Sequence, residues 1–361
     1  MKNKIKTLGV ALVGSMMATT AFTQMKVDGH QEWNLVTGSG KGSGNELEKT
    51  VGKETTLRFS WDMGKLPNGM PLTSSFRIYG ERGTIGTVNT EGASANTDVG
   101  VVGDEWIINL GVAPGLTVYA GGEIPKGIES VRTIQPNVTN RPRDIIGGTG
   151  YTGLIDAADN TSGKNYLGFD FNTAMKGVLS VVLTPSARQA TGQVSDGVAS
   201  DANRVGLTGS QYSASYRLEP APGLLVGAGF LKSEQHTNID ETESKTAGIR
   251  YTVPGTALAV GYQYTYNTDG TTATTSVERE QNTVSAVFGL TKELNVGVSY
   301  TKTERINEGV KQAVETKAKV AGASYTLGAL QLQYTYMNLE NAAHTAGREY
   351  QAHVFKTKVN F

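Results

Sequence analysis

The sequence contains no cysteine and only 10 prolines in 361 residues. Without thiols there is no disulfide framework and no cysteine-ligated metal site, and the unfolded chain has nothing to mispair in an oxidising compartment. Acidic and basic side chains balance at 33 each, so the basic excess typical of nucleic-acid-binding proteins is missing. The four histidines have no spacing suited to zinc. We therefore expect no nucleic-acid partner, no metal and no cofactor.

Long apolar runs are also missing after residue 24, which excludes a transmembrane helix in the rest of the chain. Residues 1–24 have the pattern of an export signal: Lys2, Lys4 and Lys6 precede a small, apolar stretch over 7–18, and the small residues Ala21 and Thr23 fit a cleavage site. The apolar stretch is too short to span a bilayer as a helix. We expect a signal peptide over 1–23, cleaved after Thr23 or after Ala21, and a mature chain over 24–361.

The mature chain alternates apolar and polar residues in segments of about ten, as the strands of transmembrane barrels do. Leu57, Phe59 and Trp61 alternate with polar residues, and 258–266 and 294–301 repeat the pattern. The polar positions are mostly Gly, Ser, Thr, Asn and Gln, which suits a lumen that must be wet and must leave room for solutes. A chain without membrane helices spans a bilayer only as a closed barrel.

Sixteen such segments make up an all-β, antiparallel barrel, although fourteen or eighteen strands also fit the pattern. Short turns such as 113–115, 220–223 and 254–255 alternate with long polar connections, as periplasmic turns alternate with extracellular loops. The expected strands are 25–36, 53–61, 73–82, 103–112, 115–124, 164–173, 176–184, 204–218, 223–232, 244–253, 256–267, 281–290, 293–303, 316–327, 329–338 and 350–361.

The third long connection, 125–163, is by far the longest, and a structureless loop of this length favours a functional role. The last strand alternates up to the aromatic Phe361, which suits closure onto the first strand.

In this organisation the chain resembles the Gram-negative general (diffusion) porins, from signal peptide to terminal phenylalanine. The resemblance implies an outer-membrane homotrimer in contact with lipid, through which small hydrophilic solutes and ions diffuse passively, and no enzymatic activity. It also implies that the third loop folds into the pore and sets acidic residues against basic wall residues. The family's Pro-Glu-Phe-Gly-Gly loop motif is absent, and Glu123–Glu129 is its nearest stretch. The residues expected at the constriction are the wall cations Lys26, Arg58 and Arg77 and the acidic residues Glu123, Glu129, Asp144 and Asp156, with Asp159 as a further candidate.

Four other functions remain open from the residues alone. A soluble secreted β-protein is disfavoured by the terminal Phe strand and by the Tyr-rich outward faces. A substrate-selective outer-membrane channel shares every feature above. A plugged or adhesive barrel fits less well, because strands begin almost at the mature N-terminus. A barrel enzyme with a Ser-His pair is not excluded, because serines are abundant.

Overall fold

The computed structural model describes residues 24–41, 50–82, 101–122, 126–132, 134–137, 153–155, 165–185, 187–188, 207–208, 210–233, 242–269, 277–307 and 309–361. No helix among these residues is long and apolar enough to cross a membrane.

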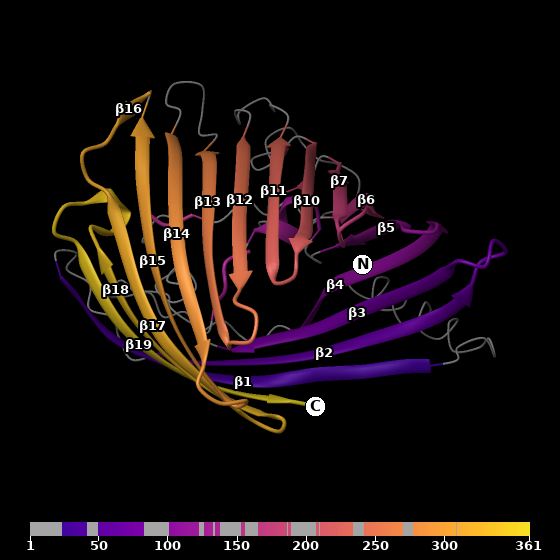
Figure 1. Cartoon of the computed structure of the whole chain (residues 1–361), viewed down its shortest axis with the longest axis horizontal. Helices are drawn as coiled ribbons and strands as arrows, with labels where there is room; N and C mark the ends of the chain where they lie inside the picture. Colours follow the sequence, from indigo (N-terminus) through magenta and orange to yellow (C-terminus); the bar gives the residue numbers. More distant parts are fainter. Residues whose placement is uncertain are drawn as a thin grey trace.

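Sixteen antiparallel strands form one closed barrel (Figure 1), as the alternation predicts. Each strand pairs with the next along the chain, and the circuit closes where β1 pairs with β19, from His30 opposite Asn360 to Lys41 opposite Glu349. Closure leaves no unpaired strand edge in the wall. The wall strands are β1 (Gln24–Lys41), β2 (Thr50–Lys65), β3 (Pro71–Arg82), β4 (Val101–Ala113), β5 (Leu116–Gly122), β6 (Asn165–Asn172), β7 (Val178–Thr184), β10 (Gln211–Ala221), β11 (Leu224–Ser233), β12 (Glu243–Thr252), β13 (Leu258–Asp269), β14 (Val277–Gly289), β15 (Leu294–Asn307), β17 (Thr316–Leu327), β18 (Leu330–Glu340) and β19 (Glu349–Asn360).

Among the described residues, five short elements lie outside this circuit. The two-residue strand β16 (Val310–Lys311) adds to the end of β15, and β8 (Ala187–Arg188) pairs with β9 (Leu207–Thr208) in a separate ribbon. Two 3-10 helices, η1 (Gly127–Val131) and η3 (Ala342–His344), lie in connections.

The two faces of the wall differ as alternation requires. In β10 the small polar side chains of Ser213 and Ser215 are buried inside the barrel, whereas the preceding residue of the same strand, Tyr212, points outward and is 38% exposed. Large apolar side chains are exposed in the same way on most other strands, for example Phe230, Val260 and Val284. The barrel therefore has an apolar outer surface and a largely polar inner one.

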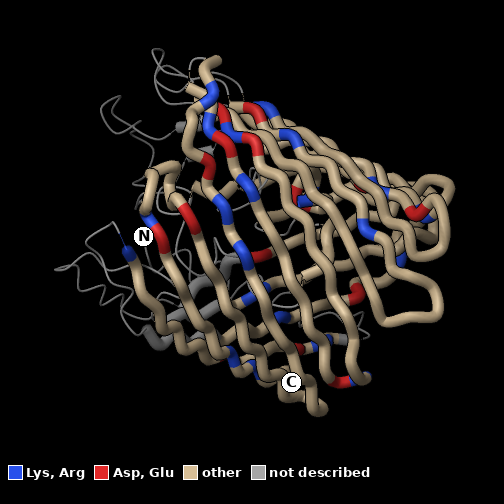
Figure 2. The backbone as a smooth tube through the Cα atoms, turned by 60° about the vertical axis from the view of Figure 1, so that its left-hand side comes forward, with Lys and Arg blue, Asp and Glu red and all other residues tan. Residues whose placement is uncertain are grey.

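Turns of two to five residues join the strands at one rim, and glycines with positive φ, such as Gly115 and Gly223, allow the tightest of them. At the opposite rim the strands run on into the polar connections. Charged residues gather toward this rim on the strands around β15 and β17 (Figure 2), where Lys302 bridges Glu304 at 2.8 Å and Glu315 at 2.7 Å.

Several expected boundaries were wrong. β10 begins at Gln211 rather than at 204, and the connections 37–52 and 304–315 are shortened because β1, β2 and β15 continue as polar, hydrogen-bonded ladder. The connection 125–163 is not structureless, because it contains η1. Alternation marks only the part of a strand that has an apolar outer face, whereas backbone pairing continues past it.

Candidate pore-lining site

Arg58 and Arg77 lie side by side on the inner face, on the paired strands β2 and β3. Both contact one carboxylate, Glu105 of β4: Arg77 Nη1 lies 2.6 Å from Oε1, and Arg58 Nη2 bonds Oε2. Glu105 is only 9% exposed at its side chain, whereas Arg58 keeps 42% and Arg77 21% of theirs. The three residues, here called the wall cluster, carry a net charge of +1 (two cations, one anion) and leave their cationic groups partly open to the lumen.

Glu105 is the member of the wall cluster that sequence reasoning missed. Strand 103–112 was expected, and its alternation places Glu105 on the inner face with Ile107. What alternation does not reveal is the register, in which a bulge between Phe76 and Ile78 brings β4 into line with Arg77.

Lys26 lies apart from the wall cluster. It is on the inner face of β1 opposite Ser60, near the short-turn rim, and its side chain is 76% exposed. Its ammonium group pairs with Asp28 at 3.1 Å, and Asp28 is the neighbour of Arg58 across the β1–β2 ladder.

The third long connection packs against the inner face through η1. Gly127 N donates to Ser180 Oγ at 3.0 Å, and Ile128 N donates to Ser213 Oγ at 3.3 Å. The side chains of Ile128 and Val131 are fully buried. Ser180 and Ser213, on the inner face of the wall, thus accept hydrogen bonds from backbone N–H groups of this segment. The contacts of η1 extend over β7, β10, β11 and β12.

Two glutamines hold the connection farther along. Gln263 of β13 accepts a hydrogen bond from Ile134 N at 2.9 Å and donates to Val131 O at 3.2 Å. Gln281 of β14 repeats the arrangement with Ile155, accepting at 2.9 Å and donating at 2.6 Å. Each side-chain amide supplies the hydrogen bonds that a neighbouring strand would otherwise provide to these backbone N–H and C=O groups. The backbone groups can therefore be buried without losing their hydrogen bonds.

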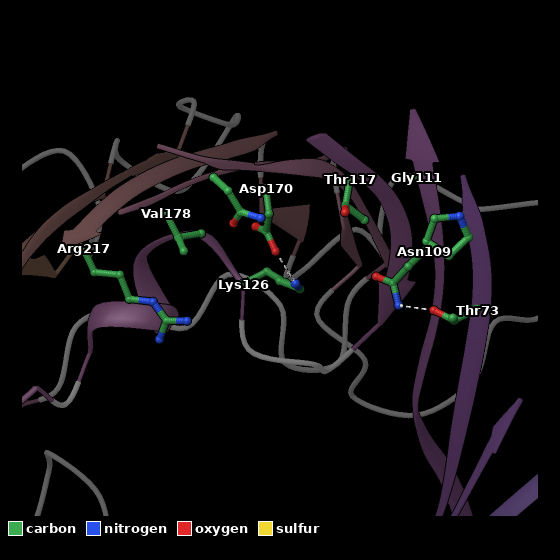
Figure 3. A pocket seen from close by; sticks show the side chains of 10 residues that line it. Thr73, Asn109, Gly111, Thr117, Lys126, Asp170, Val178 and Arg217 are labelled. Atoms are coloured by element: carbon green, nitrogen blue, oxygen red, sulfur yellow. Dashed lines mark hydrogen bonds and ion pairs between the residues drawn. The ribbon is translucent and has the colours of Figure 1, made fainter. Parts of the chain in front are cut away.

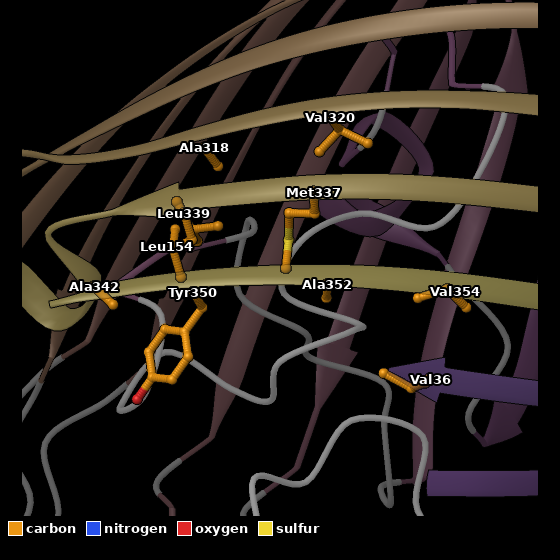
Figure 4. Packing of buried hydrophobic residues seen from close by; sticks show 10 residues of the cluster. All are labelled: Val36, Leu154, Ala318, Val320, Met337, Leu339, Ala342, Tyr350, Ala352 and Val354. Atoms are coloured by element: carbon orange, nitrogen blue, oxygen red, sulfur yellow. The ribbon is translucent and has the colours of Figure 1, made fainter. Parts of the chain in front are cut away.

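Inward-facing glycines make room for these segments. A Cβ on Gly248 would lie 2.9 Å from Ile134 Cβ, and one on Gly261 would lie 2.6 Å from Pro136 Cδ. The buried Leu154 completes the contact at the far side, in an apolar cluster with inner side chains of β1, β17, β18 and β19 (Figure 4). The described parts of the connection therefore contact the inner wall from β7 round to β19.

The segment around η1 docks on a part of the wall away from the wall cluster. In the order of the circuit, the strands of the wall cluster, β2 to β4, are the second to fourth, and the strands that η1 contacts, β7 and β10 to β12, are the seventh to tenth, three to eight positions away out of sixteen. Glu129 lies in η1 and is 7% exposed. Glu123, Asp144, Asp156 and Asp159 lie outside the described residues, so their role remains a prediction.

The connection between β18 and β19 carries a half-buried histidine, His344. Its ring Nδ1 lies 3.2 Å from Val314 O, and its backbone N donates to Thr316 Oγ1 at 3.1 Å. Burial lowers the pKa of His344 below the usual 6.5, and the positive charges of Arg279 and Arg305 lower it further. No group of three or more metal-ligating side chains occurs in the part of the chain that the structure describes.

Comparison with known proteins identifies the fold but no close relative. No protein-family model and no curated sequence matches the chain. Among solved structures, Pseudomonas putida OprB is similar over 94% of both chains, with a TM-score of 0.66 and 12% identity. OmpTdeltaL8, a loop-deletion mutant of OmpT, an outer membrane protein of Vibrio cholerae, has a TM-score of 0.63 and 8% identity over 94% of this chain and 99% of its own.

A triple mutant of the Rhodopseudomonas blastica porin is similar over 94% of this chain and all of its own, with a TM-score of 0.57 and 10% identity. At these identities the likeness concerns the backbone architecture alone. The chain has the porin-like fold of a closed, sixteen-stranded antiparallel β-barrel.

Proposed function

We propose that this protein is an outer-membrane porin of a Gram-negative bacterium, a water-filled channel through which small hydrophilic solutes and ions diffuse passively. The observation that carries the proposal is the division of the wall into an apolar outer and a polar inner face around a closed circuit. A closed barrel satisfies its backbone hydrogen bonds internally, so its outside tolerates lipid. The mechanism needs no chemistry and no cofactor.

The third connection narrows this channel. Its described segments contact the inner wall at strands from β7 to β19, and the wall cluster lies on the part of the wall formed by β2, β3 and β4. Positive groups on one side and the acidic residues Glu123, Glu129, Asp144 and Asp156 of the connection on the other would set up a transverse field. Such a field orders water and disfavours apolar solutes.

The remaining parts of the proposal concern export and assembly. Residues 1–23 direct the chain to the periplasm and are removed, and the short turns then face the periplasm. The functional unit is a homotrimer.

A substrate-selective channel is the second candidate. The structural similarity to OprB and to the Rhodopseudomonas blastica porin is compatible with both functions and does not separate them. Swelling of liposomes that contain the purified protein separates them. For general diffusion, the swelling rate falls smoothly as neutral sugars and amino acids of increasing size are tested. One solute that enters far faster than smaller ones would establish the selective channel, and no swelling with any solute would contradict the proposal.

A further inference from the structure

A polar cavity of about 390 Å³ lies against the inner wall close to the short-turn rim (Figure 3). Its lining comes from β3, β4, β5, β6, β7 and β10 and from Lys126, at the start of the third connection. Hydroxyl and amide groups of Thr73, Asn109 and Thr117 occupy one side, and Asn109 donates to Thr73 at 3.3 Å. Cavities of a few hundred Å³ with a few convergent polar groups are typical of small-molecule sites.

The charges in this cavity do not balance. Lys126 pairs with Asp170 at 2.5 Å, and its ammonium group lies 4.5 Å from the ring centroid of Tyr119. Tyr119 in turn donates to Asp170 at 3.3 Å, which fixes the carboxylate. The charge of Lys126 is thus compensated and its position is set.

Arg217 supplies the uncompensated charge. It lies on β10, lines the cavity and is exposed to the lumen. No carboxylate among the described residues forms an ion pair with it. Two cations and one anion therefore give the cavity a net charge of +1, and the planar guanidinium group is open to a ligand.

We propose that this cavity is a binding site for a small hydroxylated carboxylate, such as a sugar acid, on its way through the channel. A guanidinium group binds a carboxylate through two parallel hydrogen bonds. The hydroxyl and amide groups of Thr73, Asn109 and Thr117 then meet the hydroxyl groups of the solute. The inference rests on the proposed channel function and names a solute class for it.

The site is distinct from the wall cluster in position. Arg217 is four residues from the end of β10 and Asp170 is two residues from the end of β6, both at the short-turn rim. A solute held here sits on the proposed periplasmic side of the narrowing, where it would lower the current without closing the barrel.

The test is block of single-channel current by gluconate, with glucose as the neutral control and acetate as the carboxylate without hydroxyl groups. Gluconate is expected to reduce the current at lower concentration than either control. The substitution Arg217→Gln is expected to raise the half-blocking concentration about tenfold, the loss typical for a hydrogen-bonded charge. Arg217→Lys, which keeps the charge but not the paired donors, is expected to fall in between.

Arg250→Gln is the matched control, because Arg250 lies on the inner face of β12, near the same rim, and does not line the cavity. Equal effects of Arg217→Gln and Arg250→Gln would overturn the site, as would the absence of gluconate block in the wild-type channel. Equal block by gluconate and acetate would overturn the role of the hydroxyl groups. A protein that forms no channel in potassium chloride would instead contradict the proposed function itself.

Discussion

Two substitutions that each remove one charge from the wall cluster should shift ion selectivity in opposite directions. Glu105→Gln raises the charge of the cluster from +1 to +2, and Arg77→Gln lowers it from +1 to zero, leaving Arg58 and Glu105 as a pair. We expect the first channel to favour anions and the second to favour cations more than the wild type does.

The size of the shift follows from the exposure of the cluster to the lumen. For an ion that passes about 6 Å away in water, one unit of charge is worth about 0.7 kcal/mol, and salt at about 0.15 M reduces this roughly by half. The concentration of each ion near the cluster then changes by about 1.7-fold in opposite directions, so the cation-to-anion permeability ratio changes about threefold. Under a tenfold salt gradient, for which ideal selectivity gives about 59 mV, this amounts to about 20 mV.

The assay is the reversal potential of the reconstituted channel under a potassium chloride gradient. Lys292→Gln is the control, because it removes one charge from an exposed turn at the rim, and it should shift the potential by much less. Heat-modified mobility on a gel should confirm that each variant keeps its barrel. Shifts of the same sign in Glu105→Gln and Arg77→Gln, or shifts no larger than that of Lys292→Gln, would refute the assignment of the cluster to the ion path.

Three further predictions concern the connection, pH and closure. Gln263→Leu removes both hydrogen bonds to the third connection and should give larger, noisier conductance, whereas Gln333→Leu, on the inner face of β18, should not; equal traces would count against docking through Gln263. Because the lowered pKa keeps His344 neutral in the folded protein while the unfolded chain takes up a proton below about pH 6.5, stability should fall as pH drops through the window just below 6.5. Melting temperatures against pH should show this loss in the wild type and not in His344→Gln, and parallel curves would contradict it. Gly29→Val places a Cβ 2.3 Å from Thr56 O and 3.1 Å from the ring of Phe361, so it should weaken the β1–β19 closure and lower the temperature at which the barrel unfolds in detergent; an unchanged temperature would argue against this seam.

Alternation was sufficient to predict the fold because each strand has one face toward an apolar and one toward a polar environment. It placed Arg58 and Arg77 on the inner face, where the structure has them. Sixteen strands were expected and are confirmed, although the pattern also fitted fourteen or eighteen; turn residues such as Pro220 and Gly223 mark the short connections. The strand ends at the rim with the long connections were not predictable, because the backbone hydrogen-bond ladder continues there through residues without apolar alternation.

The contacts of the candidate site depend on register and on residues far apart in sequence. Glu105 meets Arg58 across 47 residues, and Gln263 meets Ile134 across 129. From the sequence alone, a glutamine or glycine on the inner face cannot be distinguished from one that only lines the lumen, because the segment that packs against it is not known. Lys126 and Asp170 were missed for the same reason, since one lies in a connection and the other in a strand 44 residues away.

The central claim, that the closed barrel holds a continuous water path, is tested most directly by single-channel conductance of the purified protein in a planar bilayer. The account predicts discrete, ohmic steps that scale with salt concentration and, for the proposed homotrimer, appear in groups of three. Protein that keeps its heat-modifiable barrel and yet gives no conductance would contradict the claim, because its lumen would then be closed.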